Sequence, residues 1–90
     1  MKIIDKNSTF VDVRTPGEFA EDHVPGAVNI PLHEISSRID EFKSMPKPIV
    51  TYCRSGNRRG MAVSLLKKSG IKEAVNGGGL GEILTGFHKL

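Results

Sequence analysis

The chain has 90 residues, of which 38% are hydrophobic, and its formal net charge is +3. This length fits one domain over residues 1–90 with a single hydrophobic core. No apolar run approaches the roughly 20 residues of a membrane span, so we expect no membrane partner. We expect no nucleic-acid partner either, because four Phe, one Tyr and no Trp are too few to accompany a basic stripe with stacking side chains.

The single cysteine excludes an internal disulfide, which fits a reducing compartment. The amino terminus has no long apolar run and is not a signal-peptide pattern. We therefore expect the protein in the cytoplasm, or in the periplasm if an export signal has been removed. A monomer is the expected state of one compact domain.

Short apolar runs rich in β-branched residues predict the strands. They cover residues 3–4, 9–13 (ending near Asp12), 27–29, 49–52 and 73–75. Because helical patterns alternate with these runs, we expect an α/β fold whose mostly parallel sheet carries helices on both faces. In such sheets ligands bind beyond the carboxyl ends of the strands, where Asp12, Arg14 and Cys53 fall.

Two helices are predicted in the first half of the chain. Thr15-Pro16-Gly17-Glu18 is a capping-box sequence with proline at the first helical position, so a short helix should run from about Pro16 to Asp22. Apolar residues recur at helical spacing from Leu32 to Phe42. They predict one amphipathic helix that ends before Pro46.

A third helix is predicted after the strand at 49–52. Helical spacing begins at Met61 and continues to about Ser69, where Gly70 is a natural left-handed cap. The run Gly77-Gly78-Gly79 is interpreted as a backbone turn beside the preceding loop. It leads into a short final helix near residues 81–87.

The most informative segment surrounds Cys53. The buried run 49–52 ends at this cysteine and the polar, basic stretch Arg54-Ser55-Gly56-Asn57-Arg58-Arg59 follows, before helical spacing begins. This order places the thiol at the carboxyl end of a strand, facing the amino end of a helix. Backbone N–H groups, the helix dipole and three arginines there favour the thiolate, which is the nucleophile. The alternative is a buried structural cysteine.

This loop resembles the active-site loop of the rhodanese sulfurtransferases. The segment from Phe10 to Phe19 (FVDVRTPGEF) resembles that family's amino-terminal signature, and the segment from His23 to Pro31 (HVPGAVNIP) continues it. Length and the ending Gly-Gly-Leu-Gly-Glu-Ile resemble the small single-domain, phage-shock protein E type. The resemblance implies a three-layer rhodanese fold, with a mostly parallel four- or five-stranded sheet flanked by helices.

The resemblance also implies an activity, that of a thiosulfate sulfurtransferase. Sulfane sulfur would move from thiosulfate, or a similar small anionic donor, through a Cys53 persulfide to cyanide or a thiol. Cys53 would be catalytic. The persulfide and substrate cradle would comprise Arg54, Ser55, Gly56, Asn57 and Arg58. With no second cysteine, turnover would need an external thiol such as glutathione or a thioredoxin, and no cofactor is implied.

Three further residues are candidates for supporting the site: Asp12, Arg14 and Arg59. For Asp12 we expect a structural ion pair or a bond to loop amides. For Arg14 two interpretations stay open, a structural ion pair and a place in the lining of the pocket. His23 is interpreted as a surface or turn residue. Because the three histidines are scattered without carboxylates or cysteine at ligand spacing, no metal site is expected.

Two other classes of protein compete with the sulfurtransferase. Cysteine-dependent phosphatases and arsenate reductases also use a cysteine, a ring of amides and an arginine, but their loops enclose five residues. Four residues separate Cys53 from Arg58, which makes a tighter ring suited to one sulfur atom. A rhodanese-like binding module is the third class, and such modules usually lack the cysteine that this chain keeps.

Overall fold

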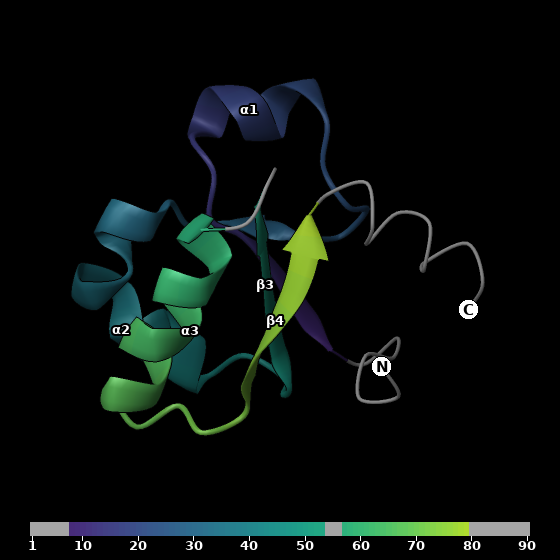
Figure 1. The fold of residues 1–90 in the computed structure, drawn as a ribbon. Coiled ribbons are helices and arrows are strands. Elements are labelled where there is room, and N and C mark those ends of the chain that lie inside the picture. The colour runs from purple at the N-terminus through teal and green to yellow at the C-terminus, as the bar shows by residue number, and fades with distance from the viewer. Residues whose placement is uncertain (1–7, 54–56, 80–90) are drawn as a thin grey trace.

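Four parallel strands form a sheet in the order β2-β1-β3-β4 (Figure 1). The computed structural model describes residues 8–53 and 57–79, with backbone only at residues 57–59. The strands are β1 (Thr9–Asp12), β2 (Val28–Asn29), β3 (Ile49–Cys53) and β4 (Ala74–Gly79). The helical segments are α1 (Pro16–Glu21), the 3-10 turns η1 (Leu32–Glu34) and η2 (Ser36–Arg38), α2 (Ile39–Lys43) and α3 (Asn57–Lys68). The predicted parallel α/β sheet is therefore confirmed.

The register of the strands brings the polar and reactive residues to one edge of the sheet. Asp12 of β1 pairs with Asn29 of β2 and with Tyr52 of β3. One residue further along, Cys53 pairs with Gly79 of β4. The carboxyl ends of all four strands therefore meet at one edge.

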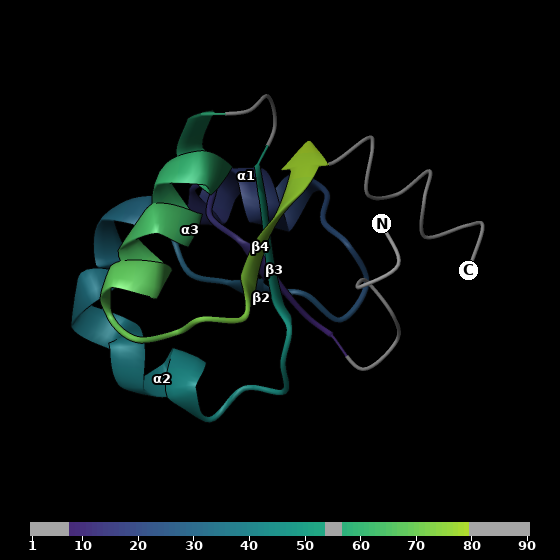
Figure 2. The ribbon, with the colours of Figure 1, turned by 60° about the horizontal axis from the view of Figure 1, so that its bottom comes forward.

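The two faces of the sheet carry separate core clusters. The larger cluster contains Val11, Val13 and Cys53 together with residues of α2 and α3, and both helices lie on the same side of the sheet (Figure 2). The smaller cluster on the opposite face contains Phe10, Val24, Val50 and Tyr52. A helical layer therefore covers one face within the described part of the chain. The expected helix at 81–87 and edge strand at 3–4 lie outside the described residues.

Helix α1 lies beyond the carboxyl ends of the strands (Figure 1) and begins as its capping box predicts. The Thr15 hydroxyl accepts a hydrogen bond from the Glu18 N–H at 3.2 Å. The Glu18 carboxylate in turn accepts one from the Thr15 N–H at 2.9 Å. These reciprocal bonds fix the first turn, although the helix buries no residue of its own.

The prediction of a single amphipathic helix from Leu32 to Phe42 is wrong, because the helical structure is interrupted. This stretch forms η1, η2 and the short α2, and the break falls at Arg38, whose φ of −122° and ψ of 25° are not helical. The N–H groups of Ile35 and Arg38 bond to carbonyls three residues earlier, which tightens each turn. The apolar period was still informative, because Ile35 and Phe42 are fully buried.

The interpretation of Gly77–Gly79 as a turn is also wrong. These glycines form the second half of β4, which is longer than the strand expected at 73–75. The pairing of β3 with β4 shifts register between Thr51 and Cys53. Gly78 has a φ of +100° at this irregularity, a conformation that glycine adopts without strain. Gly79 pairs with Cys53, whereas residues 54–56 of the loop beside which the turn was expected lie outside the described residues.

No helix in residues 8–53 and 57–79 is long and apolar enough to cross a membrane.

Candidate active site

Cys53 is the last residue of β3, a strand in which every residue is buried. Only 1% of the cysteine is exposed, and its side chain belongs to the core cluster beneath α3. The main chain then reaches the first residue of α3 at Asn57. The thiol therefore lies at a strand end that leads directly into the amino end of a helix, as the sequence predicts.

The helix after Cys53 begins earlier than expected. Helical spacing indicated a start near Met61, but α3 starts at Asn57. Asn57, Arg58 and Arg59 thus form its first turn, which contains no acidic residue. Arg54, Ser55 and Gly56 of the predicted cradle lie outside the described residues. Four of the backbone N–H groups at the start of an α-helix have no partner within the helix, so this turn suits an anion.

Asp12 and Arg14 form a buried ion pair at the end of β1. Arg14 Nε lies 2.9 and 3.0 Å from the two Asp12 carboxylate oxygens, and Arg14 Nη2 lies 2.6 Å from Oδ2. The exposed fractions of the two side chains are 1% and 0%. The hydrogen bond to Asp12 raises the pKa of Arg14, so the guanidinium stays charged. The structural interpretation of Asp12 is the one this geometry favours.

The same arginine joins β1 to the end of α1. Arg14 Nη2 donates to the carbonyl of Asp22, the residue that caps α1. The Asn29 side-chain amide donates to the carbonyls of Asp12 and Arg14, both at 3.0 Å. We call Asp12, Arg14, Asn29 and Tyr52 the strand-end network.

Tyr52 completes the strand-end network from β3. Its ring centroid lies 6.0 Å from the guanidinium carbon of Arg14. Its hydroxyl accepts a hydrogen bond from the buried Val24 N–H at 3.0 Å. Burial is the main reason that the pKa of Tyr52 is raised, so the phenol stays neutral. No sequence motif marks Tyr52 or Asn29 as a partner of Arg14. Tyr52 does stand opposite Asp12 in the sheet, so pairing of the two predicted strands was the available signal for it.

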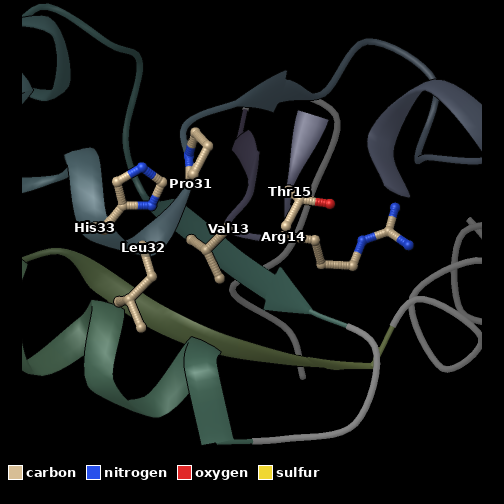
Figure 3. A pocket seen from close by; sticks show the side chains of 6 residues that line it. All are labelled: Val13, Arg14, Thr15, Pro31, Leu32 and His33. Atoms are coloured by element: carbon tan, nitrogen blue, oxygen red, sulfur yellow. The ribbon is translucent and has the colours of Figure 1, made fainter. Parts of the chain in front are cut away.

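The strand-end network and the thiol lie on opposite faces of the sheet. Successive side chains of a strand alternate between faces, so Tyr52 and Cys53 belong to different core clusters. Val13 and Arg14 alternate in the same way, and Figure 3 shows the Arg14 side chain extending toward α1 and away from Val13. Arg14 therefore lies at the carboxyl ends of the strands, but its charge points away from the face of the sheet that carries the cysteine.

A shallow cleft lies beside the end of β1, on the face that carries Cys53. Its volume is about 340 Å³. Figure 3 shows the residues that line it: Val13, Arg14, Thr15, Pro31, Leu32 and His33. Residues 31–33 were not predicted as part of a site, because a proline, a leucine and a histidine in this order form no motif of their own.

The first turn of α3 lies close to β4. A Cβ atom on Gly60 would stand 3.9 Å from the amide nitrogen of Asn76. The Asn76 side-chain oxygen accepts a hydrogen bond from the Gly78 N–H at 3.1 Å. Asn76 therefore shapes the bent part of β4 near the amino end of the helix.

His23 is placed by α1 rather than by the cysteine. Its ring stacks on Phe19 with centroids 3.8 Å apart, and Nδ1 lies 2.7 Å from the Phe19 carbonyl oxygen. His23 is half-buried in the segment between α1 and the turn at residues 25–26, so it is neither a fully exposed residue nor part of that turn. Within the described ranges, no group of three or more His, Cys, Asp or Glu side chains is arranged to hold a metal ion.

Comparisons with known proteins agree with this geometry. The model of the rhodanese-like domain matches residues 1–83. The chain is 36% identical over 75 residues to the thiosulfate sulfurtransferase PspE of Escherichia coli (strain K12), which covers 82% of this chain and 72% of PspE. It is 38% identical over 71 residues to the uncharacterized protein YqhL of Bacillus subtilis (strain 168), covering 79% of this chain but only 56% of YqhL.

A solved structure shows the same likeness in three dimensions. A rhodanese with anions from E. coli superposes with a TM-score of 0.77 at 35% sequence identity, covering 84% of this chain and 91% of the other. The family model thus covers most of the chain, and the similarity to PspE and to the solved rhodanese spans more than four-fifths of it. The chain therefore belongs to the rhodanese-like domain family.

Proposed function

We propose that this protein is a thiosulfate sulfurtransferase that carries sulfane sulfur as a Cys53 persulfide. The observation that carries the proposal is the position of Cys53, which ends a fully buried parallel strand four residues before α3 begins. A thiol held there faces the partly positive end of a twelve-residue helix, which favours its anionic form. The relative PspE bears the name of this activity.

The proposed reaction has two displacement steps. The Cys53 thiolate attacks the outer sulfur of thiosulfate, the S–S bond of the donor breaks, and sulfite leaves with the electron pair. The product is the persulfide anion on Cys53. An acceptor thiolate then attacks the outer sulfur of that persulfide, and the Cys53 thiolate leaves. Each step exchanges one S–S bond for another, so no external oxidant or reductant is needed.

The basic first turn of α3 supports an anionic donor. Cationic side chains are unfavourable at the positive end of a helix unless an anion lies there. Arg58 and Arg59 occupy this end without any acidic residue in the turn. The first turn and the loop before it would bind the dianion, and their amides would stabilise the persulfide charge without reorganising.

Arg14, the cationic residue at the end of β1, does not compete with the first turn of α3 for the donor anion. Arg14 is already bonded to Asp12 and to the Asp22 carbonyl. We therefore assign donor recognition to Arg54 and Arg58, with Arg59 supporting, and a structural role to Asp12 and Arg14. The acceptor would be an external thiol, because the chain has one cysteine and no resolving partner.

One experiment tests the proposal. Incubation with thiosulfate, without an acceptor, should add the mass of one sulfur atom to the intact protein and release one equivalent of sulfite. Excess thiol should remove the added mass. Cys53→Ser is the matched control, because a hydroxyl cannot carry the sulfur and should give no adduct.

Parallel assays with aryl phosphates and arsenate distinguish the competing enzymes. The four-residue spacing between Cys53 and Arg58 leaves few amides for three equatorial oxygens, so little hydrolysis or reduction is expected. Efficient phosphate-ester hydrolysis without a sulfur adduct would contradict the proposal and favour a cysteine phosphatase. Absence of every activity would favour a binding module.

A further inference from the structure

The cleft lined by Val13, Arg14, Thr15 and residues 31–33 has a use if the proposed function holds. We infer that this cleft receives the uncharged, apolar body of a small organic thiol that accepts sulfur from Cys53. Donor and acceptor would then use different surfaces: a basic one for the thiosulfate dianion and an apolar one for the thiol.

The cleft adjoins the reactive residue through Val13. Asp12 pairs with Tyr52, so Val13 follows in register beside Cys53, and the Val13 N–H bonds to the Tyr52 carbonyl at 3.1 Å. Val13 and Cys53 also belong to the same core cluster. Val13 is 1% exposed, so it forms the floor of the cleft, on the same face of the sheet as the thiol.

The walls of the cleft are held by the main chain. The Ile30 N–H bonds to the Asp12 carbonyl at 3.0 Å, and the Leu32 N–H bonds to the Val13 carbonyl at 3.1 Å. Leu32 also packs against the core cluster that contains Cys53. These bonds extend the pairing of β1 past its last residue, so the cleft is formed before any ligand arrives.

The charges around the cleft argue against a strongly ionic ligand. Among the six lining residues, Arg14 directs its guanidinium to Asp12 and to the end of α1 (Figure 3). His33 Nε2 lies 3.6 Å from a Glu34 carboxylate oxygen, which would repel an anion. Thr15 is engaged in its capping box. Val13 is 1% exposed and Pro31 is also buried, so the apolar surface left for contact is mainly that of Leu32.

The size of the cleft fits a small molecule. A volume of about 340 Å³ lies near the lower end of the range of roughly 300–1,000 Å³ for small-molecule sites. It is also larger than one sulfur atom needs. An aryl or alkyl thiol can place its hydrocarbon part there and its sulfur toward Cys53. Glutathione would bring two carboxylates to a surface that offers them no free cation among its described residues.

The experiment separates the two half-reactions. Protein loaded with thiosulfate is freed of donor, and decay of the persulfide mass is followed with benzyl mercaptan, 2-mercaptoethanol and glutathione. Each rate is divided by the concentration of the thiolate form of that acceptor at a fixed pH before the three acceptors are compared. We expect benzyl mercaptan to saturate the reaction at a concentration about 10-fold lower than 2-mercaptoethanol does. Burial of an additional hydrocarbon group favours one substrate over another by about this factor.

Variants at the cleft test its part in this preference. Leu32→Asn removes apolar surface and should reduce the preference for benzyl mercaptan about fivefold, with sulfite release in the donor step unchanged. His33→Glu changes a side chain that is 79% exposed, so it leaves the core intact. This substitution should further raise the glutathione concentration needed for saturation and should change that for benzyl mercaptan little. Ser69→Glu, at an exposed residue just past the last residue of α3, is the matched control for added charge.

The outcomes distinguish the two proposals. No sulfur adduct in the loading step would overturn the proposed function and the cleft assignment with it. A normal adduct with equal saturation by all three thiols, or with glutathione preferred, would overturn the cleft assignment alone. Unchanged preferences in both Leu32→Asn and His33→Glu would also overturn it.

Discussion

Tyr52 and Cys53 are neighbours in the chain, but their side chains lie in core clusters on opposite faces of the sheet. The last two residues of β3 thus separate two tasks. Tyr52 contacts Arg14 in the strand-end network and accepts a hydrogen bond from the Val24 N–H. Cys53 faces α3, where the proposed chemistry occurs. Substitutions in the strand-end network should therefore affect stability and leave the reactivity of Cys53 largely unchanged.

Arg14→Ala should destabilise the fold strongly. Removing the guanidinium leaves the Asp12 carboxylate buried without its partner, which costs roughly 3–5 kcal/mol of unfolding free energy. Chemical denaturation is the measurement. Arg38→Ala is the matched control, because its two carboxylate partners are partly exposed. That variant should cost less than about 1 kcal/mol.

The double variant Asp12→Ala/Arg14→Ala tests the pairing directly. Because both partners of the ion pair are removed, its cost should be well below the sum of the two single costs. Additive costs would mean that the two residues stabilise the protein independently.

Tyr52→Phe should lower the unfolding free energy by roughly 1–3 kcal/mol, because the buried Val24 N–H loses its acceptor. Denaturant midpoints measure the loss. If the two clusters act separately, sulfite release from thiosulfate should stay near the original rate at a temperature where both proteins are folded. A selective loss of activity at unchanged stability would contradict this.

Alkaline titration should report Tyr52 alone, because the chain has one Tyr and no Trp. Burial raises its pKa in the folded protein, whereas the unfolded chain ionises near 10. The folded state therefore holds the proton more tightly, and the contribution of this group to stability is full below pH 10 and falls as pH rises above it. Phenolate absorbance in native and denaturing buffer checks the direction of the shift. Tyr52→Phe should show a smaller loss of stability over the same pH range.

Arg58→Ala should weaken thiosulfate use selectively. Losing one charged hydrogen-bonding partner costs roughly 1.5–3 kcal/mol in transition-state binding. The defect should shrink at high salt, because salt screens exposed charges. kcat/KM for thiosulfate and for an uncharged or singly charged sulfur donor is the comparison. Equal losses for all donors would indicate a structural role for Arg58.

Gly78→Ala should destabilise the protein by roughly 1–3 kcal/mol, because its φ of +100° is strained for any side chain. Gly17→Ala is the matched control. A Cβ there would meet nothing within 4 Å and the residue lies in α1, so a neutral effect or a gain of up to about 1 kcal/mol is expected. Thermal melting of both variants distinguishes them.

The parts of the fold that local chemistry determines were predictable from the sequence. The capping box fixed the start of α1, and the β-branched run from Ile49 fixed β3 and the place of Cys53. The break at Arg38 could not be predicted, because hydrophobic spacing does not distinguish a continuous helix from successive 3-10 turns. Nor could the strand character of Gly77–Gly79, which depends on pairing with β3 rather than on glycine's own preferences.

The candidate site divides in the same way. The order strand, cysteine, basic loop and helix is a local pattern, so the position of Cys53 could be read from it. The partners of Arg14 depend on register between distant segments, which brings Tyr52 and the Asp22 carbonyl to one point. The cleft at residues 31–33 depends on how that segment pairs past the end of β1.

Strand β2 has two residues, Val28 and Asn29, and is the outermost described strand on its side of the sheet. A strand of this length presents few unpaired backbone groups to another molecule. The Asn29 amide is moreover turned inward, onto the carbonyls of Asp12 and Arg14. This side of the sheet is thus a poor template for strand addition, which should limit self-association through β2.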